Sequence, residues 1–112
     1  MRMQVTIVGG GMIVHDQLLP SFYQLQRIGL VDDITVCARR EATLAALAES
    51  SIIRHAFPTH RFGPFLEPYA GALRRMPPRN IAVVALPDQL HFEAIMESIE
   101  AGHHVISVKP LY

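Results

Sequence analysis

Short apolar runs alternate along this chain with longer stretches that are apolar on one side only. The runs are rich in Val and Ile and are closed by glycine, proline or polar residues, which is typical of strands buried in a parallel sheet. They predict strands at residues 4–8, 34–37, 51–57, 81–86 and 105–108.

The stretches between these runs carry apolar residues at helical spacing. They predict helices over residues 12–28, 41–49, 66–76 and 89–101, and a loop over residues 58–64. Pro20 lies inside the first helix and lacks the amide that a helix needs, so we expect a kink or a restart there. Asp88 is the expected N-cap of the last helix, and Gly102 is the expected residue just past its end.

The order of these elements predicts one α/β domain over residues 1–112. Strands that alternate with helices form a parallel sheet with right-handed crossovers and helices on both faces. We therefore expect a doubly wound, three-layer Rossmann sheet of about five strands with an incomplete last unit. In such a sheet, ligands bind at the carboxyl ends of the strands.

Composition and charge narrow the classes of partner. Half of the residues are hydrophobic, 18% are charged and the formal net charge is zero. This balance gives no electrostatic argument for nucleic acid or an anionic membrane, and it is compatible with a homo-oligomer. Cys37 is the only cysteine, which excludes a thiol-ligated metal cluster and favours a cytoplasmic location. No apolar run approaches the ~20 residues of a membrane span.

Three glycines, residues 9–11, follow the first predicted strand. A dinucleotide-binding turn needs a first glycine for the tight turn and a second for the approach of the pyrophosphate, and Gly9 and Gly11 fill these positions. Val14 departs from the small residue of the third position. The amides of Met12 and Ile13, at the helix start, would favour phosphate. The alternative is a glycine turn that binds no ligand.

Two arginines, Arg39 and Arg40, follow the second predicted strand. A carboxylate at this place hydrogen-bonds the ribose 2′-hydroxyl of NAD, but here Glu41 comes only after both arginines. A guanidinium pairs well with a phosphate, so the sequence favours NADP over NAD. The alternative is that both arginines are solvated loop charges.

The last third of the chain resembles a known family. Residues 83–91 (VVALPDQLH), residues 101–105 (AGHHV) and Lys109-Pro110 are similar to the cofactor domain of the Gfo/Idh/MocA oxidoreductases. That domain typically shows a strand, P-x-x-x-H, a helix ending in A-G-x-x-V, a short strand and E-K-P. The resemblance extends over essentially the whole chain from the glycine turn onward.

The resemblance implies roles for individual residues. Lys109 matches the catalytic lysine that lies near the nicotinamide and the substrate hydroxyl. Pro110 matches the proline that shapes the same turn. The positions beside the cofactor are matched by Leu86, Pro87 and His91.

The chain also departs from the family pattern at residue 108, and the pattern gives no role to its other histidines. Val108 stands where the family usually has glutamate, so any role of that carboxylate is absent here. His103 and His104 are adjacent, so their rings would point apart on a strand and would not chelate a metal. His15, His55 and His60 have no matched partners in the sequence.

The resemblance implies the NAD(P)-binding part of a dehydrogenase acting on a sugar, a polyol or a related hydroxy or keto substrate. In the family a second domain follows and closes the substrate site; no such domain follows Tyr112, so we expect nucleotide binding without turnover. Two other functions remain open: a non-catalytic dinucleotide-binding sensor or regulatory module, and a partner-docking domain that binds no dinucleotide.

Overall fold

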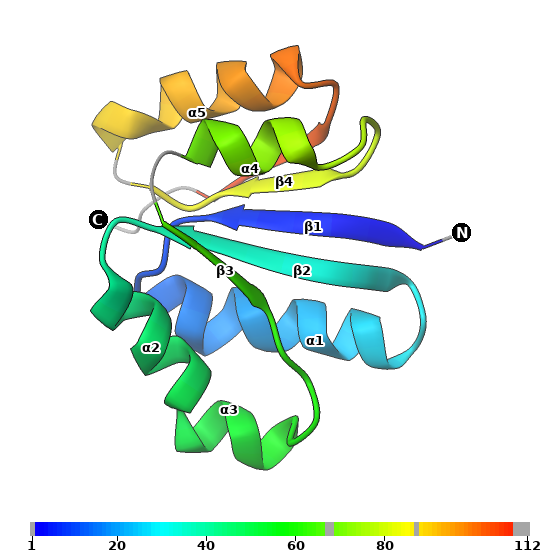
Figure 1. Cartoon of the computed structure of the whole chain (residues 1–112), viewed down its shortest axis with the longest axis vertical. Coiled ribbons are helices and arrows are strands. Elements are labelled where there is room, and N and C mark those ends of the chain that lie inside the picture. The colour runs from blue at the N-terminus through cyan, green and yellow to red at the C-terminus, as the bar shows by residue number, and fades with distance from the viewer. Residues whose placement is uncertain (1, 67–68, 87, 109–112) are drawn as a thin grey trace.

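The protein folds around a central parallel sheet with helices on both of its faces (Figure 1). The computed structural model describes residues 2–66, 69–86 and 88–108, except for the side chains of Asp88 and Gln89. The five strands are arranged in the order β3-β2-β1-β4-β5. Their bounds are β1 Met3–Val8, β2 Val31–Ala38, β3 Gly63–Leu66, β4 Ile81–Val84 and β5 His104–Ser107.

The helices form the two outer layers of a three-layer α/β/α sandwich, as the sequence predicted. A π-helical turn η1 and helices α1, α2 and α3 lie on one face, and α4 and α5 lie on the other (Figure 1). Their bounds are η1 Val14–Leu18, α1 Leu19–Arg27, α2 Glu41–Glu49, α3 Ser51–Ala56, α4 Tyr69–Arg75 and α5 Asp88–Glu100.

The central strand β1 supplies side chains to both layers because successive residues of a strand point to opposite faces. Val5 and Ile7 belong to the larger apolar cluster, beneath α1 and α2. Val8 packs with Leu73 of α4 and Ala82 of β4 in a smaller cluster on the other face. Because both faces of β1 are covered, residues 5–8 are all buried, including the polar Thr6.

Pro20 restarts the first helix, as expected. The residues before it form the π-helical turn, and the amide of Leu19 donates to the carbonyl of Val14, five residues earlier. Pro20 then occupies the first turn of α1, where a missing amide costs little because amides of that turn have no partner within the helix. The π turn lies directly after the glycine turn, so it belongs to the surroundings of the candidate site.

The strand predicted at residues 51–57 is wrong, because this segment forms helix α3. The Ser50 side chain caps α3 by accepting a hydrogen bond from the amide of Ile53 at 3.4 Å. Ile53 is buried, whereas Ile52 is 73% exposed, so the pair of β-branched residues does not mark a buried strand. The third strand is instead β3, inside the segment expected to be loop and helix.

Strand β3 contains Pro64, which is tolerated because β3 lies at the edge of the sheet and pairs only with β2. Helix α4 therefore starts later than predicted. The last helix starts at Asp88, the residue predicted as its cap, and ends two residues before Gly102. Gly102 has φ of +84°, the left-handed conformation expected of a glycine past a helix end.

Candidate functional site

The glycine turn lies at the carboxyl edge of the sheet, where β1, β2 and β4 end. The amide of Gly9 donates to the carbonyl of Cys37 at 2.9 Å, and the amide of Ala85 donates to the carbonyl of Val8 at 2.9 Å. Gly9 has φ of +122°, and a Cβ on it would lie 2.3 Å from the carbonyl oxygen of Ala85. Glycine is therefore required here for both backbone conformation and space.

The next two glycines face different surroundings. A Cβ on Gly10 would lie 2.7 Å from Cγ2 of Thr43, so this residue lets the turn pack against α2. A Cβ on Gly11 would meet no atom within 4 Å, so this position is open to a ligand. No acceptor among the described residues pairs with the amides of Gly10 and Gly11. Unpaired amides that precede a helix are suited to holding a phosphate group.

A groove of about 570 Å³ runs from the glycine turn across the ends of the strands. It brings together five of the predicted cofactor residues, from β1, β2 and β4, because all of them follow strand ends. Its other lining residues include Thr43, Tyr69 and Glu93, which no pattern in the sequence marks. The described residues that line the groove are Gly9, Gly10, Gly11, Cys37, Ala38, Arg39, Arg40, Thr43, Tyr69, Leu86, Leu90 and Glu93.

The charges of this groove favour an anion at the end of β2. Arg39 and Arg40 are both exposed, and neither forms an ion pair with any described residue. Among the described residues that line the groove, Glu93 alone carries a carboxylate. The two guanidinium groups are therefore available to a ligand that carries phosphate.

The predicted cofactor residues that do not line this groove lie in several different places. His91 is 9% exposed, does not line the groove, and neither of its ring nitrogens has a hydrogen-bond partner among the described residues. Met12 is 75% exposed at the start of the helix, next to the open position of Gly11, while Ile13 packs against the larger core cluster. Pro87, Lys109 and Pro110 lie outside the described residues.

Val108 is the last described residue before that predicted catalytic lysine. Its amide donates to the carbonyl of Val84 at 2.9 Å, which places it beside the end of β4. Its side chain is partly buried and packs against the larger core cluster. The position that is glutamate in the resembled family is therefore an apolar core contact here.

His15 does have partners, contrary to the expectation from sequence. Its Nδ1 lies 2.7 Å from Oδ1 of Asp16, and its Nε2 lies 2.7 Å from Oγ of Ser50. Ser50 is 35 residues away along the chain, so no local pattern marks the pair. His15 lines a second hollow of about 640 Å³, which shares Gly10, Gly11, Arg40 and Thr43 with the groove.

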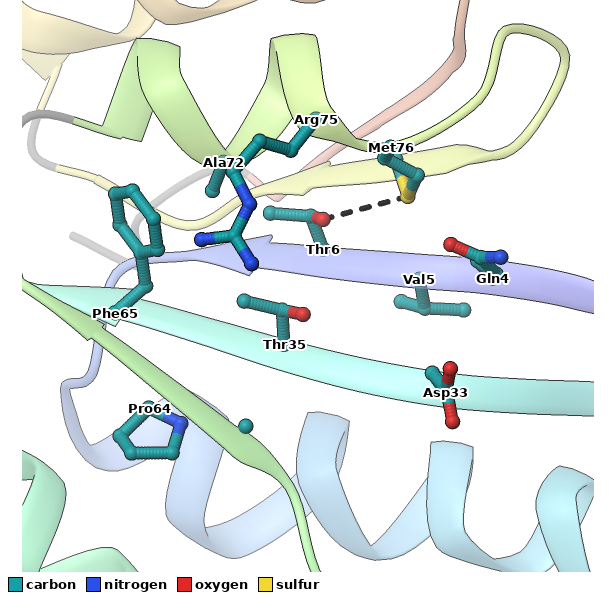
Figure 2. A pocket seen from close by; sticks show the side chains of 11 residues that line it. Gln4, Val5, Thr6, Asp33, Thr35, Pro64, Phe65, Ala72, Arg75 and Met76 are labelled. Carbon is teal, nitrogen blue, oxygen red and sulfur yellow. Dashed lines mark hydrogen bonds between the residues drawn. The ribbon is translucent and has the colours of Figure 1, made fainter.

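A separate pocket of about 240 Å³ lies on the face of the sheet that α4 covers (Figure 2). Its floor contains the buried hydroxyl of Thr6, which donates to Sδ of Met76 at 3.3 Å. The guanidinium of Arg75 reaches over the pocket from α4, with its Cζ 5.6 Å from the centre of the Phe65 ring. None of the residues lining this pocket belongs to the glycine turn or to the groove.

The described residues contain no group of three or more His, Cys, Asp or Glu side chains placed to hold a metal ion. Among the helices of the same residues, none has both the length and the apolar character needed to cross a membrane.

The chain is similar in sequence to one protein family and in fold to several solved structures. Residues 3–112 match the Gfo/Idh/MocA oxidoreductase family, NAD-binding Rossmann fold. No curated protein matches the chain significantly.

Three solved structures illustrate the similarity of fold. An oxidoreductase from Thermotoga maritima has a TM-score of 0.70 at 20% identity, over 97% of this chain and 30% of its own. Scyllo-inositol dehydrogenase from Lactobacillus casei has a TM-score of 0.66 at 16% identity, over 97% of this chain and 28% of its own. Biliverdin reductase from Synechocystis was solved with biliverdin and NADP+. It has a TM-score of 0.65 at 23% identity, over 96% of this chain and 29% of its own chain. This chain thus spans less than a third of each of these proteins.

Proposed function

The chain belongs to the Gfo/Idh/MocA family of oxidoreductases, and from this membership we propose that it binds a nicotinamide dinucleotide in the groove at the glycine turn. One observation carries the proposal. The open, unpaired amide of Gly11 and the unpaired guanidinium groups of Arg39 and Arg40 line a single groove. A dinucleotide offers phosphate to both, the pyrophosphate to the glycine turn and a 2′-phosphate to the arginines.

We propose NADP as the preferred cofactor, with NAD bound more weakly. Neighbours of similar fold have been solved with either form: biliverdin reductase with NADP+, and levoglucosan dehydrogenase with NADH. The end of β2 in this chain supports the phosphorylated form, because the groove has no carboxylate from that strand to accept a ribose 2′-hydroxyl.

Titration of the chain with NADPH and NADH, followed by cofactor fluorescence, tests cofactor binding. We expect saturable binding of both, tighter for NADPH. Gly11→Val should abolish binding of both cofactors while the chain stays folded, because the side chain would enter the space that the pyrophosphate needs. Absence of affinity for either cofactor would leave the partner-docking function.

The oxidoreductase reaction itself is a further step of the proposal. A bound nicotinamide supplies a hydride acceptor or donor. Lys109 would hydrogen-bond the reacting oxygen of a sugar or polyol and exchange its proton. We propose that this turnover requires more of the protein than these 112 residues. Clear multiple turnover of a polyol or sugar ketone by the chain with its cofactor would contradict this.

One observation favours a second function, a non-catalytic dinucleotide-binding sensor. Val108 packs against the core at the position where the family usually has glutamate. This chain therefore has no carboxylate at that position to take part in proton transfer. Val108→Glu separates the two functions when the chain is fused to a substrate domain of the family. Turnover that is already present with Val108 supports the enzyme, and turnover that appears only with glutamate supports the sensor.

A further inference from the structure

His15, Asp16 and Ser50 form a continuous hydrogen-bonded relay on the wall of the second hollow. The carboxylate of Asp16 can only accept, so in the neutral imidazole the proton lies on Nδ1, which donates to Oδ1 over 2.7 Å. Nε2 is then an acceptor, and the hydroxyl of Ser50 donates to it over 2.7 Å. Oγ of Ser50 still accepts from the amide of Ile53 at 3.4 Å.

This order of donors and acceptors is that of an activated serine: a hydroxyl whose proton faces a base, and a base whose other nitrogen is held by a carboxylate. The three side chains come from two places, η1 and the junction of α2 with α3, which the hydrogen bond between His15 and Ser50 joins. The π turn is the local feature that the relay depends on, and such turns occur often at functional sites.

The relay opens onto space that a substrate could occupy. The hollow of about 640 Å³ is lined by both His15 and Ser50. The hollow is also lined by Met12 and Ile52, which are 75% and 73% exposed, and by Ala46 and Leu47. The apolar part of this lining, beside the polarised hydroxyl, suits a small apolar acyl group.

We propose that Ser50 is a nucleophile for acyl transfer, with His15 as its general base and Asp16 as the residue that positions the imidazole. The substrate class is an activated carboxylic ester with a small apolar acyl group. This inference does not depend on dinucleotide binding.

Ser50 is first acylated and is then set free by water. Oγ of Ser50 bonds to the carbonyl carbon while its proton passes to Nε2 of His15. The bond to the leaving alcohol then breaks, the alcohol oxygen takes that proton, and an ester of Ser50 remains. Water attacks this ester by the same route and releases the carboxylic acid and the free serine.

Covalent labelling of the full chain with a fluorophosphonate, mapped by mass spectrometry, tests the nucleophile. We expect a single label on Ser50 of the folded chain and none on the urea-unfolded chain. Ser50→Asn removes the hydroxyl but keeps a good helix cap, so it should stay folded and unlabelled. Ser51→Ala is the matched control and should be labelled at the wild-type rate.

The base has its own test, which does not touch the cap of α3. His15→Ala should slow labelling, and also the hydrolysis of p-nitrophenyl acetate, by about a hundredfold or more. Added imidazole should restore much of the loss, which a purely structural role of His15 would not allow. For Asp16, Ala should slow labelling and Glu should restore part of the rate. A label that lies elsewhere than Ser50, or that forms equally fast without His15, would overturn the proposal.

Discussion

Gly9 and Ala85 lie so close that no side chain fits between them: a Cβ on Gly9 would stand 2.3 Å from the carbonyl oxygen of Ala85. The two residues follow the ends of β1 and β4, which pair through Val8 and Val84. This contact fixes the glycine turn against the sheet, and it leaves Gly11 facing open space. The fold therefore requires glycine at position 9, whereas at position 11 it leaves space for a side chain.

Gly9→Ala should destabilise the fold by roughly 3 kcal/mol or more, because it combines a strained positive φ with a clash against backbone. Gly11→Ala is the matched control. Its Cβ meets no protein atom, so stability should be unchanged or higher by up to about 1 kcal/mol. Urea unfolding of both variants measures the difference. Equal losses of stability in the two variants would contradict the distinction.

Gly10→Ala should cost about 1–2 kcal/mol through the contact at 2.7 Å with Cγ2 of Thr43. Thr43→Ser removes that methyl group and keeps the hydroxyl. The double variant should therefore be more stable than the sum of the two single effects, with a coupling free energy of about 0.5 kcal/mol or more. A double-mutant cycle in urea measures it. Strict additivity would show that the turn relaxes away from α2.

Much of the fold and part of the candidate site follow from the sequence for one physical reason. Residues just after buried strands meet at one edge of a parallel sheet. The sequence alone therefore predicts that Gly9, Arg39 and Leu86 lie close together, and all three line the same groove. The alternation of strands and helices predicted the parallel sheet and its two helical layers, but not the order of the strands.

The remaining features depend on contacts that no local pattern encodes. Helix α3 forms where a strand was predicted because Ser50 caps it and Ile52 stays exposed. The true third strand carries Pro64, which only its place at the sheet edge permits. The pairing of His15 with Ser50 joins segments 35 residues apart, so it depends on the tertiary fold.

Arg39→Asp and Arg40→Asp should each weaken NADPH binding about tenfold or more and NADH binding much less. The reason is that a charge-assisted hydrogen bond to the 2′-phosphate is worth about 1.5–3 kcal/mol. Arg54→Asp in α3 makes the same change of net charge at an exposed position outside the groove and serves as the control. The dissociation constants for NADPH and NADH are measured for each variant and compared as a ratio. If this ratio changes equally in all three variants, net charge and not direct contact sets the preference for NADPH.

Tyr23 should ionise only at high pH. Burial raises its pKa from 10.0 to about 12, and the positive charge of Arg61 opposes the shift only in part. The ring is 3% exposed and lies 5.6 Å from Phe57 and 5.5 Å from His60 between centroids.

The folded state therefore favours the neutral phenol of Tyr23. This contribution is complete below the unfolded pKa of about 10 and is lost as the pH rises from there towards about 12. The free energy of unfolding should fall over that range in the wild type and fall less in Tyr23→Phe, which cannot ionise. Tyrosinate absorbance of the folded chain should show a late step that this variant lacks. If the wild type and the variant lose stability in parallel above pH ~10, Tyr23 is not the group responsible.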